Sequence, residues 1–201
     1  VGIDESVGML RVAHSANGSL PIATALAIDL PFRDGAFDAV LANFVIAHFT
    51  KYKTALFELK RVLRPGGRLG FTAWADAEDD LSRTWFELVQ SVVPREVVQA
   101  AMDERLPWRE RFRQRLPLEE ALMEAGIRQV RTEVRRYRFQ YSLDEYVEGM
   151  GTWATGRFVR SMLGESGFAA FLGRARAVFG DRFADPVNDF REVLFATGTK
   201  P

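Results

Sequence analysis

The chain has no cysteine, only two histidines and no excess of charge of either sign. The absence of cysteine excludes disulfides, thiolate metal ligands and a cysteine nucleophile, and two histidines give a metal site little support. Lysine plus arginine and aspartate plus glutamate each total 27, so the formal net charge is zero. We therefore expect no metal and no general attraction to nucleic acid or to an anionic membrane surface.

Long hydrophobic runs are also missing. The longest apolar stretch, residues 39–49, is interrupted by Asn43 and His48, and a membrane-spanning helix needs about 20 apolar residues. No signal-peptide pattern opens the chain, so we expect a cytoplasmic protein. The 201 residues, 47% hydrophobic and 27% charged, are typical of one globular domain.

The first part of the chain alternates between strand and helix patterns. Ser6 is a plausible N-cap for a helix, and Pro65-Gly66-Gly67 is expected to end a helix that has one apolar stripe. This alternation favours an α/β sheet with right-handed crossovers. The predicted strands are residues 1–4, 22–28, 37–44 and 68–74, and the predicted helices are residues 7–14 and 55–63.

The second part is dominated by helical patterns. Residues 76–116 are charged and helical, residues 117–125 form a further helix, and residues 143–183 form a second helical block. Residues 127–141 are predicted to be one long strand, and the apolar parity changes near Arg135-Arg136, which predicts a bulge there. Residues 193–199 are expected to form the last strand.

Three segments in series carry a resemblance to a known family: Val1-Gly2-Ile3-Asp4-Glu5-Ser6-Val7-Gly8-Met9-Leu10, then Asp29-Leu30-Pro31-Phe32-Arg33-Asp34-Gly35-Ala36-Phe37-Asp38-Ala39-Val40, then Leu63-Arg64-Pro65-Gly66-Gly67-Arg68-Leu69. Together they resemble the small-molecule class I S-adenosylmethionine-dependent methyltransferases. The terminal Phe195-Ala196-Thr197-Gly198-Thr199-Lys200-Pro201 resembles the last strand of that family.

The resemblance implies the fold. We expect residues 1–201 to form a single methyltransferase domain with a Rossmann-like sheet, mostly parallel with an antiparallel last strand, flanked by helices. Helical insertions at residues 76–116 and 142–189 would cover the substrate. The first strand and glycine-rich loop of the family are absent, because Val1 to Asp4 already match the end of its second strand, and we expect further sequence upstream.

The resemblance also implies a cofactor site for S-adenosylmethionine. A carboxylate at the end of a strand can accept hydrogen bonds from both ribose hydroxyls of a nucleoside, and Asp4 is placed for this role. The other residues carried over are Glu5 and Met9 beside the adenine, the backbone of Ala27 and Ile28 at the adenine edge, and Asn43 and Phe44 near the methionine part. Leu26 departs from the family, because many relatives have an aspartate there that binds the adenine amino group.

Substrate-binding candidates are aromatic. Trp74 follows a strand and should reach the cleft, while Tyr146 and Trp153 lie in the second helical block, where core packing is the alternative. His48 is a candidate catalytic base because an imidazole can take up a proton under physiological conditions, and a packed histidine at a helix start is the alternative. Arg128, Arg131, Arg135, Arg136 and Arg138 indicate a charged sheet edge rather than a nucleic-acid surface.

The sequence therefore predicts an enzyme that transfers a methyl group from S-adenosylmethionine to a small molecule. Two alternatives stay open. Asp4 would serve the ribose of a nicotinamide cofactor equally well, which corresponds to an oxidoreductase. A catalytically inactive cofactor-binding or scaffold protein is compatible with Leu26 and the missing loop.

Overall fold

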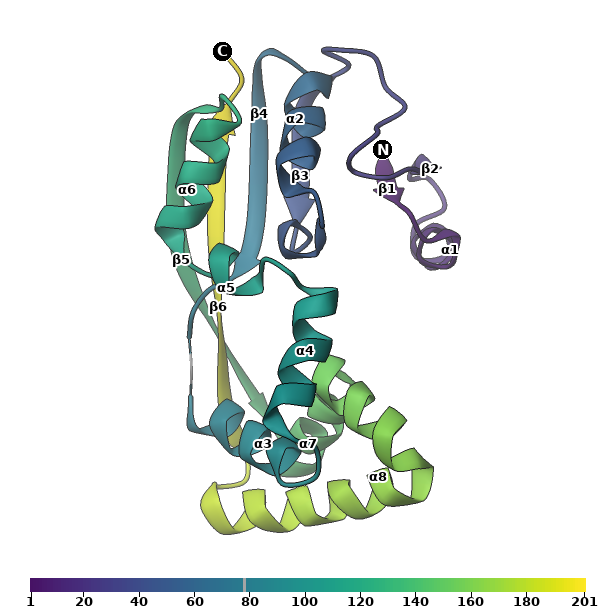
Figure 1. Ribbon diagram of the computed structural model, residues 1–201, viewed down its shortest axis with the longest axis vertical. Coiled ribbons are helices and arrows are strands. Elements are labelled where there is room, and N and C mark those ends of the chain that lie inside the picture. Colours follow the sequence, from purple (N-terminus) through teal and green to yellow (C-terminus); the bar gives the residue numbers. More distant parts are fainter. Residues whose placement is uncertain (78) are drawn as a thin grey trace.

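The computed structural model describes residues 1–77 and 79–201 as an α/β fold with a helical block at one end (Figure 1). The strands are β1 (Gly2–Asp4), β2 (Ile22–Thr24), β3 (Phe37–Asn43), β4 (Leu63–Trp74), β5 (Arg128–Tyr141) and β6 (Val187–Thr199). The helices are α1 (Val7–Ala16), the 3-10 turn η1 (Ile46–His48), α2 (Tyr52–Val62), α3 (Asp80–Gln90), α4 (Arg95–Arg105), α5 (Arg109–Phe112), α6 (Arg115–Glu124), α7 (Leu143–Thr152) and α8 (Ala154–Arg182).

The strands form two sheets. In the larger sheet the order is β3-β4-β6-β5, and β6 runs antiparallel to both of its neighbours while β3 and β4 are parallel. Strands β3, β4 and β5 therefore share one direction and the last strand opposes them, which confirms the predicted sheet. The smaller sheet pairs β1 with β2 in parallel.

The two sheets are not hydrogen-bonded to each other in the part of the chain that the structure describes. Strand β1 has a partner on one edge only, β3 likewise, and no ladder among the described residues joins them. Figure 1 shows β1, β2 and α1 beside the larger sheet, on the side of β3. Apolar side chains are exposed on these elements, among them Ile3 on β1 and Leu41 on β3, the latter 73% exposed.

The molecule has two hydrophobic cores. The first lies between the larger sheet and helices α2, α5 and α6, and includes Leu56, Phe71, Phe112 and Leu122. The second joins α3, α4, α7 and α8 to the start of β6, and is centred on Trp85. The predicted insertions therefore differ in extent from the helical block, because Phe112 packs on the sheet side and residues 187–189 already belong to β6.

The Pro65-Gly66-Gly67 turn lies inside β4 rather than ahead of the strand, which corrects the predicted start at Arg68. Helix α2 ends at Val62, and β4 pairs with β3 first at Phe37–Leu63 and next at Ala39–Arg68. The extra residues form a bulge, and Gly66 takes a φ of 74°, which favours glycine. The Gly66 N–H donates to the Lys200 carbonyl at 2.8 Å, so the end of the chain holds this turn.

The bulge predicted at Arg135-Arg136 is wrong. The register of β5 against β6 shifts instead between Arg128 and Arg131, where Gln129 has a φ of 53°, and pairing is continuous from Arg131 to Tyr141. The change of apolar parity has another cause. The strand leaves the first core, on which Val130 packs, and reaches the second core, on which Tyr141 packs, so the covered face changes along a twisted strand.

Two predicted strands differ in length. Strand β2 ends at Thr24 rather than at residue 28, because the chain turns back through an isolated bridge between Leu26 and Asp29. Strand β6 begins at Val187 rather than at residue 193, since it continues beside β5 into the helical block. Both differences reflect tertiary pairing, which local sequence patterns do not specify.

Candidate functional site

The carboxyl ends of β3 and β4 point toward the helical block (Figure 1). The candidate site therefore lies between the larger sheet and the helical block, in the region that we call the waist. In open α/β sheets, ligands bind beyond the carboxyl ends of the strands. Asn43 ends β3 and Trp74 ends β4 at this edge. Beyond Trp74 the chain stays paired with β6, since the Ala75 N–H donates to the Glu192 carbonyl at 2.9 Å.

Asp4 ends β1 as expected. One carboxylate oxygen, Oδ1, accepts a hydrogen bond from the Ser6 N–H at 2.7 Å, and the Ser6 hydroxyl in turn caps α1 by accepting from Met9 N–H. The turn therefore fixes the Asp4 side chain through one oxygen, and in the described part of the chain no hydrogen bond engages the other. Such a carboxylate can still accept from a hydroxyl group.

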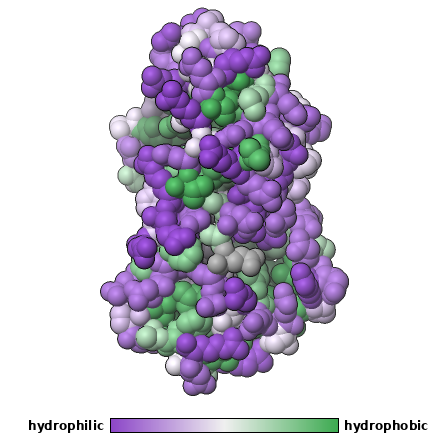
Figure 2. All heavy atoms as spheres, turned by 90° about the vertical axis from the view of Figure 1, so that its left-hand side faces the viewer, coloured by the Kyte–Doolittle hydropathy of each residue, from purple (hydrophilic) through white to green (hydrophobic). Residues whose placement is uncertain are grey.

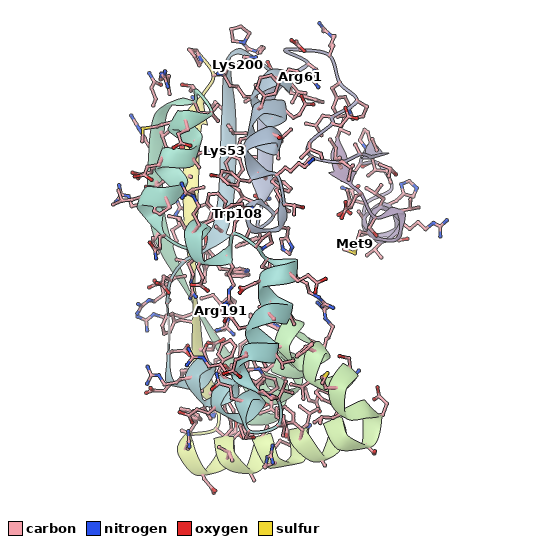
Figure 3. The ribbon with its side chains drawn as sticks, viewed as in Figure 1. Met9, Lys53, Arg61, Trp108, Arg191 and Lys200 are labelled. Atoms are coloured by element: carbon pink, nitrogen blue, oxygen red, sulfur yellow. The ribbon has the colours of Figure 1, made fainter. Side chains whose placement is uncertain are left out.

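Glu5 and Met9 are exposed beside Asp4. Met9 is 57% exposed, and Figure 3 shows it on the side of α1 that faces the larger sheet. An apolar side chain in this position can cover the face of a flat ring bound between the two sheets.

Ala27 and Ile28 lie at the tip of the turn that the Leu26–Asp29 bridge closes, with the Asp29 N–H donating to the Leu26 carbonyl at 3.0 Å. Neither amide of the tip residues donates to another group among the described residues. The turn thus leaves two backbone donors available, while the Leu26 side chain is exposed and offers no acceptor.

A partly buried ion pair between Glu58 and Arg61 holds the loop that follows this turn. Glu58 on α2 accepts from the Leu30 N–H at 2.9 Å, and the Arg61 guanidinium donates to the Leu30 carbonyl at 2.9 Å and to the Phe32 carbonyl at 2.7 Å. Hydrogen bonds from Arg61, opposed by burial, lower the pKa of the Glu58 carboxyl below its usual range. The loop is therefore anchored to the first core through α2, which carries Arg61 (labelled in Figure 3).

Asn43 and Phe44 are exposed at the end of β3. Phe44 has a φ of 53°, which is rare for a bulky residue, and its N–H donates to the Thr72 carbonyl at 3.0 Å and to the Thr72 hydroxyl at 3.1 Å. Backbone strain of this kind persists where the surroundings enforce it, and it clusters at functional sites.

Three exposed aromatic rings continue from this point toward the helical block. The Phe44 ring stacks on Trp74 with centroids 4.4 Å apart, and Trp74 lies 6.5 Å from Trp153, which precedes α8. Trp74 and Trp153 are 50% and 47% exposed. The Arg191 guanidinium lies over the Trp153 ring at 4.8 Å. We call Phe44, Trp74 and Trp153 the aromatic row.

Tyr146, a predicted substrate ligand, is placed differently from Trp74 and Trp153. Its side chain is only 3% exposed, because it packs in the second core. Its hydroxyl is buried and completes no hydrogen bond of normal geometry among the described residues, although Asp189 and Arg191 are close enough to act on its charge. Burial, with the Asp189 charge in support, raises the pKa of Tyr146 above its usual range.

Asp189 and Arg191 were not predicted as site residues. They lie on one face of β6, and Arg191 Nη1 donates to Asp189 Oδ1 at 2.5 Å. The Asp189 side chain is almost completely buried, and burial raises the pKa of its carboxyl while Arg191 opposes the rise. Figure 3 places Arg191 at the waist. The signal that could have found them is an acid and a base two residues apart, which places both side chains on the same face of a strand.

His48 lies exposed at the end of η1, and among the described residues its side chain makes no hydrogen bond or ion pair. Its place near the ends of β3 and β4 keeps it a candidate base, but no neighbouring carboxylate orients it. In the same part of the chain, no cluster of His, Asp or Glu could hold a metal ion.

The arginines of β5 lie on the edge strand of the larger sheet, as predicted. Arg136 pairs with Glu192 at 2.6 Å and lies over the Phe190 ring, and Arg135 pairs with Glu133. Figure 2, which looks onto this side of the molecule, shows a mostly hydrophilic surface with small scattered apolar patches. Ion-paired charge of this kind protects a sheet edge from pairing with other strands.

No helix in the described ranges combines the length and the apolarity that crossing a bilayer requires. Two surface hollows lie away from the waist. One is formed by α1 and β2 around Leu10, and the other by α3 and the start of β6 around Leu81. The hollow at α1 and β2 is the bare face of the smaller sheet rather than a closed pocket.

Comparison with known proteins finds a family match in the first third of the chain. Residues 1–71 match the methyltransferase domain family. The chain is 45% identical over 69 residues to the demethylmenaquinone methyltransferase of Streptomyces avermitilis, a match that covers 34% of this chain and 30% of that protein. It is 48% identical over 73 residues to the Thermus thermophilus enzyme of the same name, covering 34% and 33%. The chain thus spans about a third of these relatives.

Solved structures extend the likeness to the whole fold. The YcgJ protein of Bacillus subtilis superposes with a TM-score of 0.54 at 20% identity, covering 99% of this chain and 81% of that one. Phosphoethanolamine N-methyltransferase 2 of Haemonchus contortus, bound to phosphomonomethylethanolamine and S-adenosylhomocysteine, has a TM-score of 0.50 at 17% identity, covering 100% and 43%. At these identities the comparison establishes the fold.

Proposed function

Because residues 1–71 match the methyltransferase domain family and the whole chain resembles the fold of solved S-adenosylmethionine-dependent methyltransferases, we propose that this protein transfers a methyl group from S-adenosylmethionine to a small-molecule acceptor. The observation that carries the proposal is the placement of Asp4, at the end of β1, together with an exposed aromatic row at the carboxyl ends of β3 and β4.

The residues at the sheet ends fit the cofactor. Asp4 would accept from the ribose hydroxyls through its unused carboxylate oxygen, and Met9 would cover the adenine. The amides of Ala27 and Ile28 would bind the adenine edge in place of the missing aspartate at Leu26. Asn43 would contact the methionine part. When bound, the cofactor supplies a methyl group on a sulfonium, whose S–C bond electrons return to sulfur as the acceptor forms the new bond and releases a proton.

The protein itself would contribute by holding the cofactor and the acceptor in position for the reaction. Helices of the block cover the waist, and Phe44 and Trp74 give the acceptor a wall beside the methyl group. Holding two reactants in line can contribute up to about 7–11 kcal/mol in favourable cases. His48 is near enough to the same edge to receive the proton, a role that its exposure permits.

The methyl acceptor of the relatives cannot be assigned directly to this chain. Their names give demethylmenaquinone as substrate, and the residues that match the Streptomyces and Thermus enzymes make up only about a third of this sequence. The helical block, whose residues line the other side of the waist, lies outside residues 1–71.

Calorimetry with S-adenosylhomocysteine, the demethylated product, tests the proposal without turnover. Asp4→Ala should lower affinity about 10- to 100-fold, because a hydrogen bond to a charged group contributes about 1.5–3 kcal/mol. Asp103→Ala, an exposed aspartate on α4, serves as the matched control and should bind as the parent does. Equal loss in both variants contradicts the proposed role of Asp4.

The unpaired edges of β1 and β3 allow a second test of the proposal. A chain extended at Val1 by a strand and a glycine-rich loop of the kind that the resemblance implies should bind more tightly than the 201-residue chain, because an added strand could pair with the open edges of β1 and β3. Binding of NAD in place of S-adenosylhomocysteine would favour an oxidoreductase. No heat from the extended chain with either ligand contradicts the proposal and favours a scaffold.

A further inference from the structure

We propose that the free edge of β5 binds an extended acidic peptide segment of a partner protein, which adds to the larger sheet as a further strand. The inference rests on two observations, an unpaired and unbroken strand edge and arginines on both faces of that strand. It goes beyond the proposed function and needs neither the cofactor nor the methyl acceptor, so either can fail without the other.

The outer edge of β5 is open. Strand β5 ends the larger sheet and has β6 as its neighbour on one side. On the other side, no strand ladder and no backbone hydrogen bond from another element reaches it among the described residues. The strand is 14 residues long, whereas an average strand has about 5–6 residues. An edge of this length presents a row of unpaired N–H and C=O groups to which an extended peptide can add as a strand.

Most of the features that block such an edge are missing from β5. The strand contains no proline and no glycine, and its shift of register lies near its start, between Arg128 and Arg131. Val134, Tyr137 and Phe139 are 50%, 42% and 40% exposed, so the strand offers apolar contacts in addition to its backbone groups. Charge is the protecting feature that remains, and charge excludes some partner strands while it favours others.

The charge of β5 favours an acidic strand. The strand contains five arginines and one glutamate, although the chain as a whole has a formal net charge of zero. Arg135 and Arg136 pair with glutamates. Arg131 and Arg138 are exposed, and their side chains make no ion pair in the described part of the chain. Opposite charges across a strand pair stabilise it and like charges destabilise it, so an acidic strand fits this edge and a second copy of β5 does not.

The placement of the arginines favours a peptide over a nucleic acid. Side chains alternate between the two faces of a strand, and pairing with β6 is continuous over these positions. Arg131 and Arg135 therefore lie on one face of the sheet, while Arg136 and Arg138 lie on the other. Nucleic acids are bound by basic groups that gather on one face. A strand added to the edge also alternates, so its acidic side chains can reach both faces.

The spacing of the two unpaired arginines sets the length of the segment. Arg131 and Arg138 are seven positions apart, which corresponds to about 23 Å along an extended strand. An odd spacing places them on opposite faces. A matching strand therefore needs two acidic residues at the same spacing, whichever direction it runs.

Fluorescence anisotropy with a labelled peptide tests the inference on the folded protein. The probe is a ten-residue peptide in which two aspartates seven positions apart flank alternating threonine and valine. One comparison peptide has lysine in place of both aspartates, and another keeps the aspartates but has proline in place of a central valine. We expect the aspartate peptide to bind about tenfold more tightly than either, because lysine opposes like charges and proline removes a backbone donor.

Charge reversal separates the edge of β5 from the rest of the surface. Arg131→Glu and Arg138→Glu should each weaken binding of the aspartate peptide about threefold to tenfold and should strengthen binding of the lysine peptide. Arg11→Glu makes the same change of charge at an exposed position on α1, which lies on the β3 side of the larger sheet (Figure 1). This control should bind as the parent does, and circular dichroism checks that each variant is folded.

Four outcomes would overturn the inference. Three of them are equal binding of the three peptides, equal effects of the β5 and α1 variants, and no binding of the aspartate peptide at low salt. The fourth is tighter binding of single-stranded oligothymidine than of the aspartate peptide, lost in Arg131→Glu, which would favour a nucleic-acid surface instead.

Discussion

The Phe44 ring stacks on the Trp74 ring with centroids 4.4 Å apart and planes 27° from parallel, while the Phe44 backbone has a φ of 53°. The two features depend on each other. Thr72 holds the Phe44 N–H through its carbonyl and its hydroxyl, and this fixes the chain in the left-handed region as it leaves β3. The strained backbone places the ring on the end of the neighbouring strand, at the proposed acceptor site.

Comparing glycine with alanine at Phe44 isolates the strain from the stacking, because both substitutions remove the ring. Phe44→Gly should be more stable than Phe44→Ala by about 1 kcal/mol, since glycine adopts positive φ without a steric penalty. Urea denaturation of both variants measures the difference.

Val45 provides the control, because its φ is −112°. There the order should reverse, with Val45→Ala more stable than Val45→Gly by about 0.5–1 kcal/mol, the entropic cost of glycine. The same sign at both positions would show that the left-handed conformation of Phe44 is not populated in solution.

Glu58 should make stability depend on pH. Its pKa is lowered from the usual 4.5, mainly by hydrogen bonds from Arg61. A carboxylate whose pKa is lower in the folded state stabilises the fold above its ordinary pKa, and this contribution is lost as the pH falls toward the lowered value. Glu58→Gln should therefore destabilise the protein at pH 7 by about 1–3 kcal/mol, because the Leu30 N–H and Arg61 lose an ionised acceptor.

Thermal unfolding between neutral and acid pH tests this sign. The gap in melting temperature between parent and Glu58→Gln should be largest at pH 7 and should narrow below the usual pKa of 4.5. Glu120→Gln, at an exposed position on α6, should follow the parent throughout. A gap that stays constant with pH would mean that the charge of Glu58 does not stabilise the loop.

Much of the first core follows from local sequence. Ser6 caps α1 as its residue type predicts, and the run after Asp38 forms a strand because it is apolar on both faces. Pro65-Gly66-Gly67 does end α2, but its residues also join β4, because the Lys200 backbone pairs with them from the far end of the chain. Such long-range pairing is not encoded in a local turn pattern.

The acceptor side could not be predicted in the same way. Trp74, Trp153 and Arg191 belong to three elements far apart in sequence, and their contact depends on how β6 enters the helical block. Tyr146 shows the limit of residue type as a guide. An aromatic residue in a helical pattern was a fair candidate ligand, yet the neighbouring helix α8 buries it.

A substitution at the junction between α7 and α8 should disturb the aromatic row, because Trp153 lies at that junction. Gly156 lies one turn into α8, and a Cβ added there would lie 2.4 Å from the Met150 carbonyl oxygen and 2.5 Å from that of Gly151. Both atoms belong to the backbone of α7, so neither can move without separating the helices. Gly156→Ala should destabilise the protein by about 1–3 kcal/mol through overpacking.

The effect should reach the proposed acceptor site, because Trp153 precedes α8 directly. Gly156→Ala should therefore also shift the tryptophan fluorescence of the folded protein. Gly173, in the same helix, is exposed and has no atom within 4 Å of an added Cβ, so Gly173→Ala should instead stabilise the protein by about 0.5–1 kcal/mol and leave the fluorescence unchanged. Thermal unfolding and fluorescence spectra of the two variants measure both effects. If Gly156→Ala were as stable as Gly173→Ala, the two helices would not be in the close contact on which the placement of Trp153 depends.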